Sequence, residues 1–416
     1  MTRRTAPAML LILLSLAVGA CGSGSAATPQ SAVTPASSLA AATPTDTAPP
    51  AASSAASSLP TARPNSGAFS PTESMKAARE SHTATLLADG RVLIAGGVDD
   101  VATLASAELF DPKTGAFTLT GSMKTARDGH TATLLADGRV LIAGGYDSKT
   151  LLTFASAELF DSKTGAFTPT GSMATARADA TATLLADGRV LIAGGYDTRT
   201  RQVFASAELY DPETGTFTAA GSMASKRFFQ GAVALQDGRV LVVGGYSAPY
   251  SSGCASCTGI LASVELFGPK TGTFSPAGST ADGRYGAAAA QLQDGRVLVV
   301  EGFSQGSNLT TTGELYDPKT GAYSTTRSMA DGQNGHIATL LQGGLVLITG
   351  GHDASGDSTA SAEVFDPAAG AFGPTGAMAT ARSGYTVTLL SDGRVLVAGG
   401  IDNDLHALAS AEIYKP

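Results

Sequence analysis

The stretch that decides the fold is Asp-Gly-Arg-Val-Leu-Ile-Ala-Gly-Gly at residues 89–97. The same nine residues return at 137–145 and 187–195, and altered copies stand at 237–245, 294–302, 343–351 and 392–400. Consecutive copies begin roughly 50 residues apart, a period that indicates a propeller or another repeat array. The unit is therefore one supersecondary element, present seven times.

Each unit divides into four short strands. In the first unit an apolar run at 82–87 ends at Asp89-Gly90, a hairpin signal, and the second strand follows at 91–95. That second strand is apolar on both faces, which indicates burial between neighbouring sheets. Residues 106–111 form the third strand, and a turn with Pro112 and Gly115 leads into the fourth near 117–119.

Four antiparallel strands with a double glycine after the second resemble the kelch repeat. The likeness extends over residues 66–416 and implies an all-β, seven-bladed kelch-type β-propeller. The tryptophan usual in the fourth strand of the family is here Phe or Tyr, at Phe69, Phe117, Phe167, Phe217, Phe274, Tyr323 and Phe372.

The two ends of the repeat region predict how the ring closes. The chain stops at residues 411–416, directly after a third strand, so the seventh unit lacks its fourth. The orphan segment 66–71 reads as a fourth strand. We therefore expect the N-terminal segment to complete the last blade and to remove its exposed edge.

The segment 1–65 predicts export and anchoring. Residues 1–20 combine Arg3 and Arg4 with an apolar run, as a secretory signal does. The end of this segment, Val-Gly-Ala before Cys21, resembles the lipobox of bacterial lipoproteins, which implies a lipidated Cys21; the alternative is an ordinary signal peptide with a chance cysteine. Residues 21–65, rich in Ser, Ala, Thr and Pro, predict a disordered tether. The expected location is extracytoplasmic, with the lipid holding the chain to a membrane.

Composition excludes one class of partner. The net charge is −8 and the isoelectric point is about 5.1, whereas nucleic-acid binding needs a basic face. We expect a monomer that binds no nucleic acid and carries no cofactor or metal.

One face of the propeller is the expected functional face. The turns between first and second strands, and between third and fourth strands, are short and uniform. The loops between second and third strands, and the crossings between blades, vary in length and content, as binding loops on rigid scaffolds do. We call this second side the variable-loop face. Six arginines recur at one repeat position on it and predict either an anion-binding ring or a brace between blades: Arg79, Arg127, Arg177, Arg227, Arg284 and Arg382.

Departures from the repeat mark the candidate ligand site in blades four to six. Aromatic rings beside amides and charged groups suit sugar recognition, although drift among degenerate repeats gives the same pattern. The candidate residues are Arg227, Phe228, Phe229, Gln230, Arg284, Tyr285, Glu301, Gln333, Asn334 and His336. Three histidines share one repeat position (His82, His130 and His336), where packing or capping is expected rather than metal binding.

Cys254 and Cys257 stand in the longest variable loop. In an exported chain with no other partner for either thiol, they predict a local disulfide, with a metal site as the alternative.

Three classes of function follow. A module that binds a protein or a glycan is the leading interpretation, and a purely structural envelope protein is another. An enzyme is the third, because kelch propellers include galactose oxidase. That resemblance implies copper held by tyrosines and histidines and a cysteine cross-linked to one tyrosine, and no residue of this chain can be matched to that set. The Ser-X-Asp-X-Gly-X-Thr-Trp box of sialidases is also missing from the sequence. We therefore favour binding over catalysis.

Overall fold

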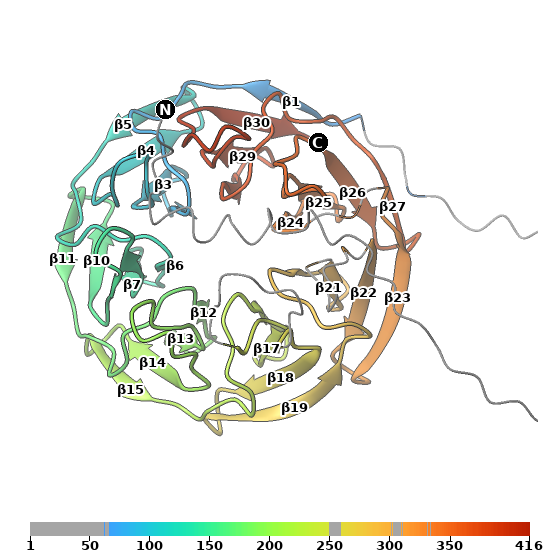
Figure 1. Cartoon of the computed structure of the whole chain (residues 1–416), viewed down its shortest axis with the longest axis horizontal. Helices are drawn as coiled ribbons and strands as arrows, with labels where there is room; N and C mark the ends of the chain where they lie inside the picture. The colour runs from blue at the N-terminus through green and yellow to red at the C-terminus, as the bar shows by residue number, and fades with distance from the viewer. Residues whose placement is uncertain are drawn as a thin grey trace, which may run out of the picture. The chain divides into compact units, whose positions relative to one another are not determined.

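The structure is a computed structural model that describes residues 62, 66–248, 259–300, 302, 309, 311–330, 332 and 334–416. These residues form seven four-stranded antiparallel sheets, which are the blades of a propeller. Figure 1 shows the blades following one another around a ring, from blue through green and yellow to red. The predicted all-β, seven-bladed fold is confirmed. None of the described residues forms a helix with the length and apolarity that a membrane crossing needs.

Blades 1 to 3 follow the chain in order. Blade 1 consists of β2 (Thr83–Leu86), β3 (Val92–Ala95), β4 (Ala107–Asp111) and β5 (Ala116–Leu119). Blade 2 consists of β6 (Thr131–Leu134), β7 (Val140–Ala143), β10 (Ala157–Asp161) and β11 (Ala166–Pro169), with a small hairpin of β8 (Tyr146–Asp147) and β9 (Leu152–Thr153) in its variable loop. Blade 3 consists of β12 (Thr181–Leu184), β13 (Val190–Ala193), β14 (Ala207–Asp211) and β15 (Thr216–Ala219).

Blades 4 to 7 complete the ring. Blade 4 consists of β16 (Gly231–Ala234), β17 (Val240–Val243), β18 (Ser263–Gly268) and β19 (Thr273–Ser279). Blade 5 consists of β20 (Ala288–Gln291), β21 (Val297–Val300), β22 (Thr312–Asp317) and β23 (Ala322–Ser328). Blade 6 consists of β24 (Ile337–Leu340), β25 (Val346–Thr349), β26 (Ala362–Asp366) and β27 (Ala371–Pro374). Blade 7 consists of β28 (Thr386–Leu389), β29 (Val395–Ala398), β30 (Ala411–Lys415) and β1 (Ala68–Pro71).

The core lies between blades rather than within them. Side chains alternate along β3, so Val92 and Ile94 pack with Leu396 of blade 7, while Leu93 packs with Val140 of blade 2. All four residues of β3 are buried, as the two-sided apolar pattern predicted. In each blade an aromatic ring of the fourth strand packs on one of the third strand, at centroid distances of 4.8–5.0 Å. Phe and Tyr thus fill the packing place of the usual tryptophan.

The N-terminal strand closes blade 7. β1 pairs antiparallel with β30, from Ala68 opposite Lys415 to Pro71 opposite Glu412, and Figure 1 shows the blue strand beside the red one. The ring of Phe69 lies 4.8 Å from that of Tyr414. The closure predicted from the orphan segment is therefore confirmed.

The double glycine has a steric cause. Gly97 has φ +86°, and a Cβ placed there would lie 2.3 Å from the carbonyl oxygen of Glu80 on the crossing that enters the same blade. Only glycine permits this approach at this dihedral angle. The double glycine therefore fixes the crossing, and the crossing carries the residues of the candidate site.

Candidate functional site

The repeated arginines are buried braces of the blades. Arg177 is 1% exposed, and its Nη1 donates to the carbonyl of Ser206 (2.9 Å) while its Nη2 donates to Oε1 of Glu208 (3.0 Å). Glu208 also accepts the backbone N–H groups of Ala174 (2.7 Å) and Thr175 (3.1 Å). The ion pair thus ties the crossing into a blade to the third strand of that blade.

The same brace recurs in six blades, which corrects one expectation. The six arginines are 0–1% exposed and pair with buried glutamates at 2.6–3.2 Å. Arg227 pairs with Glu265 and Arg284 pairs with Glu314, so neither guanidinium is exposed on the surface. Of the two interpretations of the arginine ring, the brace is correct.

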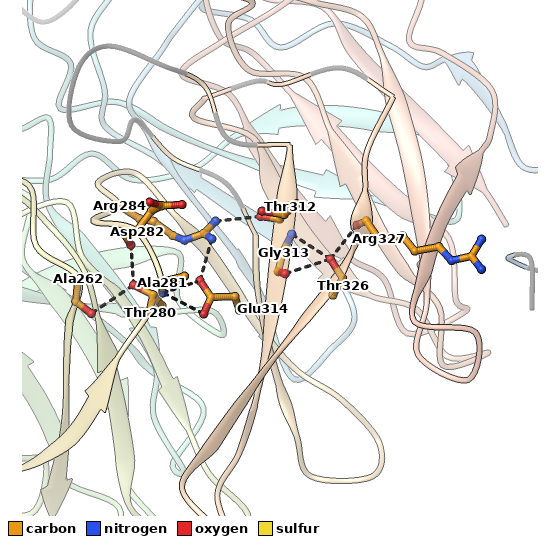
Figure 2. A network of polar contacts seen from close by, with 10 residues as sticks. All are labelled: Ala262, Thr280, Ala281, Asp282, Arg284, Thr312, Gly313, Glu314, Thr326 and Arg327. Carbon is orange, nitrogen blue, oxygen red and sulfur yellow. Dashed lines mark hydrogen bonds and ion pairs between the residues drawn. The ribbon is translucent and has the colours of Figure 1, made fainter. Parts of the chain in front are cut away.

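Blades 4 and 5 depart from the repeat around one of these braces, which Figure 2 shows. Arg284 donates to the carbonyl of Thr312 (3.0 Å) and to Glu314 (2.8 Å). The register between the third and fourth strands shifts between Ser263 and Glu265 in blade 4, and between Thr312 and Glu314 in blade 5. Such bulges change the direction of the adjacent chain and often lie beside functional sites. The irregular sector coincides with the blades in which the candidate residues were placed.

The histidine position joins neighbouring blades. Nε2 of His130 lies 2.9 Å from the hydroxyl of Thr83, and Nε2 of Gln230 donates to the carbonyl of Ala193 (2.8 Å). Burial lowers the pKa of His130 to about 3, so this imidazole is neutral. Gln230 and His336 are 7% and 4% exposed. Both therefore lie within the blade packing, and their assignment as ligand contacts stays a prediction.

Seven residues, one from each blade, form what we call the inner ring of the variable-loop face. Each stands two positions before the innermost strand of its blade, and all seven have a positive φ: Ser81, Gly129, Asp179, Phe229, Gly286, Gly335 and Gly384. Backbone hydrogen bonds connect members of adjacent blades, from Asp179 N to Gly129 O (2.9 Å), Phe229 N to Asp179 O (3.4 Å) and Gly286 N to Phe229 O (3.0 Å). Phe229 is a bulky residue in the left-handed region, which is a strained conformation.

An aromatic cluster stands beside the inner ring in blades 3 to 5. Phe228 is 2% exposed, and its ring centroid lies 4.7 Å from that of Tyr196, 5.1 Å from that of Phe229 and 5.7 Å from that of Tyr246. Tyr285 extends the cluster, 5.8 Å from Tyr246. The structure thus brings the predicted Phe228, Phe229 and Tyr285 together. Phe229 and Tyr285 remain partly exposed on the variable-loop face.

Three carboxyl groups stand at the inner ring in blades 1 to 3, and the sequence interpretation missed them. An added Cβ on Gly129 would lie 2.9 Å from Oδ1 of Asp179, and one on Gly384 would lie 3.1 Å from Oε2 of Glu80. Asp128 is 3% exposed. Burial raises the pKa of Glu80 and of Asp179 to about 7, and burial together with the charges of Asp179 and Glu80 raises that of Asp128 well above its ordinary value. These residues occupy the repeat positions of Phe228 and Phe229.

Neighbouring variable loops are tied together over part of the ring. Side-chain hydrogen bonds join Thr103 to Ser148, Thr153 to Thr198, and Ser358 to Asn403, and Asp100 accepts the backbone N–H of Ala407. These contacts connect blades 6, 7, 1, 2 and 3. The loops of blades 4 and 5 lie largely outside the described residues.

The remaining predicted site residues are Asn334 and several residues that the structure does not describe. Asn334 is 9% exposed, and its Oδ1 lies against Gly286 of the inner ring. Cys21, Cys254, Cys257, Glu301 and Gln333 lie outside the described residues, so their predicted roles stay predictions.

One group of described acidic and histidine residues could share an ion: Asp402, Asp404 and His406 of blade 7. Oδ1 of Asp402 accepts the backbone N–H groups of Asp404 (3.0 Å) and His406 (2.9 Å). Asp353 closes the corresponding loop of blade 6 in the same way, with Ser355. We therefore assign Asp402 to the turn of its loop.

The fold and the site define the class of this protein, a seven-bladed β-propeller. Comparison with known proteins adds that the kelch motif matches residues 180–224, which span blade 3, so the propeller is similar to those built from kelch repeats. The structure resembles a fungal alcohol oxidase of the AA5 family solved in complex with copper, with TM-score 0.67 and 18% identity over 85% of this chain and 77% of that one. It also resembles YjhT, with TM-score 0.53 and 13% identity over 70% of this chain and 96% of that one. These likenesses show the fold alone. No curated protein matches the sequence.

Proposed function

We propose that this propeller is an extracytoplasmic binding module, held to a membrane through a lipid on Cys21, that recognises a protein or glycan with its variable-loop face. The observation that carries the proposal is the asymmetry of the inner ring. The braces and double glycines repeat around the propeller and serve the fold. At the inner ring, by contrast, blades 1 to 3 present carboxyl groups, and blades 3 to 5 present the aromatic cluster.

Strain supports the assignment of the site. A non-glycine residue at a positive φ costs about 1–3 kcal/mol and is found mainly where the surroundings or a function require it. Phe229 has this conformation although glycine occupies the same position in four other blades. Partly exposed Phe229 and Tyr285 offer a contact surface of the kind that dominates binding energy in many interfaces.

Unbiased capture from envelope extracts, run beside a glycan array, tests the binding role. Phe229→Ala should lose the captured ligand. The matched control is Leu119→Ala, because Leu119 is an exposed apolar residue (66%) on an outer strand, away from the inner ring. Equal binding by both variants would move the site elsewhere. Alanine at Arg227 or Arg284 is not a useful probe, because either change removes a buried brace.

The anchor needs a separate test. Metabolic labelling with a fatty acid should label the wild-type chain, and Cys21→Ser should abolish both the label and the membrane fraction. A Cys21→Ser chain that still fractionates with membranes would contradict the lipid anchor.

We do not propose the oxidase alternative, because no residue of this chain can be matched to the copper ligands that the galactose oxidase resemblance implies. Copper of the kind that the galactose oxidase resemblance implies needs two histidines beside two tyrosines. Nε2 of His82 and of His130 lies 2.9 Å from a threonine hydroxyl, and Nδ1 of His352 lies 3.2 Å from the carbonyl of Gly356. We therefore derive no redox step for this chain.

A further inference from the structure

The inner ring gathers carboxyl groups that lack a cationic partner. Among the described residues, Glu80, Asp128 and Asp179 form no ion pair, although the arginines next to Glu80 and Asp128 in sequence are present. Arg79 and Arg127 are directed to Glu108 and Glu158 instead. The groups that face the three carboxyl groups are acidic or phenolic, namely Asp100, Asp147 and Tyr146.

Two buried oxygen atoms at the inner ring lack a hydrogen-bond donor. Oδ2 of Asp179 is buried without a hydrogen-bond partner, and so is Oδ1 of Asn334, whose residue is 9% exposed. Both side chains lie over an inner-ring glycine of the preceding blade, Gly129 and Gly286. A buried acceptor without a donor is unfavourable, so a ligand that donates hydrogen bonds here would recover the lost hydrogen-bond energy.

The spacing of the carboxyl groups disfavours a single metal ion. Asp402, Asp404 and His406 form the one described group of such residues whose ligand atoms all lie within 4.8 Å of one another. Glu80, Asp128 and Asp179 do not meet this limit, although each comes from a successive blade. Metal coordination needs oxygens within about 2.0–2.6 Å of one centre. Carboxyl groups that are farther apart are better matched by a ligand that carries several N–H donors some distance from one another.

The aromatic cluster indicates what that donor is attached to. Phe229 adjoins Asp179 through the hydrogen bond between their backbones, so carboxyl groups and aromatic rings are continuous along the ring. The rings are tilted against one another at 34–48° for Phe228 with Tyr196 and Phe229, and for Tyr246 with Tyr285. A slender aliphatic stem that ends in a cation suits this surface, because rings attract cations and carboxylates pair with them.

We infer that the inner ring binds a basic side chain, lysine or arginine, projecting from a protein partner. The inference rests on the proposed binding function and adds its ligand class. The cation would lie among Glu80, Asp128 and Asp179, and the stem would contact Phe229. This ligand class differs from the anion-binding alternative that the sequence left open for the arginine ring, because those arginines are buried.

The site carries its own pH signature. The raised pKa values mean that the carboxyl groups take up protons near neutral pH, and a protonated carboxyl group offers no charge to a cation. Binding of the basic side chain should therefore strengthen as pH rises from 5.5 to 8. His82 and His130, which stand close by, are neutral through this range, because burial lowers the pKa of both.

The test uses the full chain on an array of nine-residue peptides with randomised flanks. The central residue is lysine, arginine, ε-acetyllysine, norleucine or glutamate, and a glycan array is run in parallel. We expect lysine- and arginine-centred peptides to bind at least tenfold more strongly than acetyllysine or norleucine peptides. Asp179→Asn should reduce that preference at least tenfold. Glu73→Gln removes one exposed charge from the crossing that enters blade 1 and should leave the preference unchanged.

Each outcome decides between the proposals. Equal binding of lysine and acetyllysine peptides, or an equal loss in Glu73→Gln and Asp179→Asn, would overturn the basic-side-chain site. Glycan binding that Phe229→Ala abolishes, without any lysine preference, would overturn the ligand class and keep the binding function. No binding on either array and no captured partner would overturn both. Circular dichroism and thermal melting of each variant confirm that it is folded before its binding is compared.

Discussion

Replacing Arg177 by methionine should destabilise the propeller by about 3–5 kcal/mol, the usual cost of breaking a buried ion pair. The change keeps the aliphatic stem and removes the guanidinium, which is 1% exposed. Glu208, 4% exposed, would retain two backbone N–H donors but lose its charged partner. The carbonyl of Ser206 would also lose its side-chain donor. The large cost comes from the uncompensated charge rather than from lost packing.

A matched control lies in the same blade. Arg189 pairs with Asp187 at 2.6 Å, but the Arg189 side chain is 34% exposed and that of Asp187 is 44% exposed. An exposed pair contributes about 0–1 kcal/mol, because water screens the charges and the side chains lose freedom. Arg189→Met should therefore cost no more than about 1 kcal/mol, although the two substitutions remove the same chemical group.

Urea unfolding followed by circular dichroism measures both free energies, and the midpoint should fall far more for Arg177→Met. Two results would refute the brace. One is a loss of unfolding free energy below about 1 kcal/mol in Arg177→Met, which is the range of an exposed pair. The other is an equal loss in the two variants. Blade 6 offers a natural comparison. Its glutamate, Glu363, is only partly buried, and Gln333 replaces the arginine in the sequence.

Three further outcomes follow from the packing and the charges. Phe69→Ala should destabilise by about 2 kcal/mol, because it removes the ring that packs on Tyr414 and weakens the strand that closes blade 7. Unchanged thermal melting of that variant would contradict the closing role. Gly145→Ala should destabilise by more than about 3 kcal/mol in urea unfolding, because its Cβ would lie 2.6 Å from a backbone oxygen. Gly138 is the control, because it has nearly the same φ and a Cβ there would have no atom within 4 Å. Gly138→Ala should cost about 1 kcal/mol. The raised pKa of Asp179 means that the folded state holds protons that the unfolded state has released, so stability should fall as pH rises from about 4 to about 7, and Asp179→Asn should flatten that decline in a pH series of melts.

Most of the fold could be predicted because the repeat supplied independent copies of the same evidence. The two-sided apolar pattern of residues 91–95, the double glycine and the orphan segment 66–71 each correspond to an observed feature. Whether a given side chain is buried or exposed was harder to predict. The sequence locates Arg227 on a crossing but does not say whether its guanidinium turns outward or toward Glu265, since that direction depends on how two blades pack.

The candidate site was predicted in part for a related reason. Phe228, Phe229 and Tyr285 stood out because aromatic residues interrupt a run of small ones. Glu80 and Asp128 did not, because acidic residues are common on crossings and nothing in the sequence shows that the two become neighbours. Their closeness arises only when the blades close into a ring. A comparison of the position of Glu80 and Asp128 across all blades would have shown that it never holds the same residue twice.

The dihedral angles of the inner ring offer a way to separate structural from functional residues in a repeat protein. Every blade needs a positive φ at this position, and glycine satisfies it without strain in four of them. Ser81, Asp179 and Phe229 also adopt a positive φ, with side chains that the backbone disfavours there. None of these side chains is needed to close a blade, because blades with glycine close equally well. Strain at a repeat position that glycine can fill therefore marks residues to test for function, and of these three Asp179 and Phe229 lie where the acidic and aromatic parts of the ring meet.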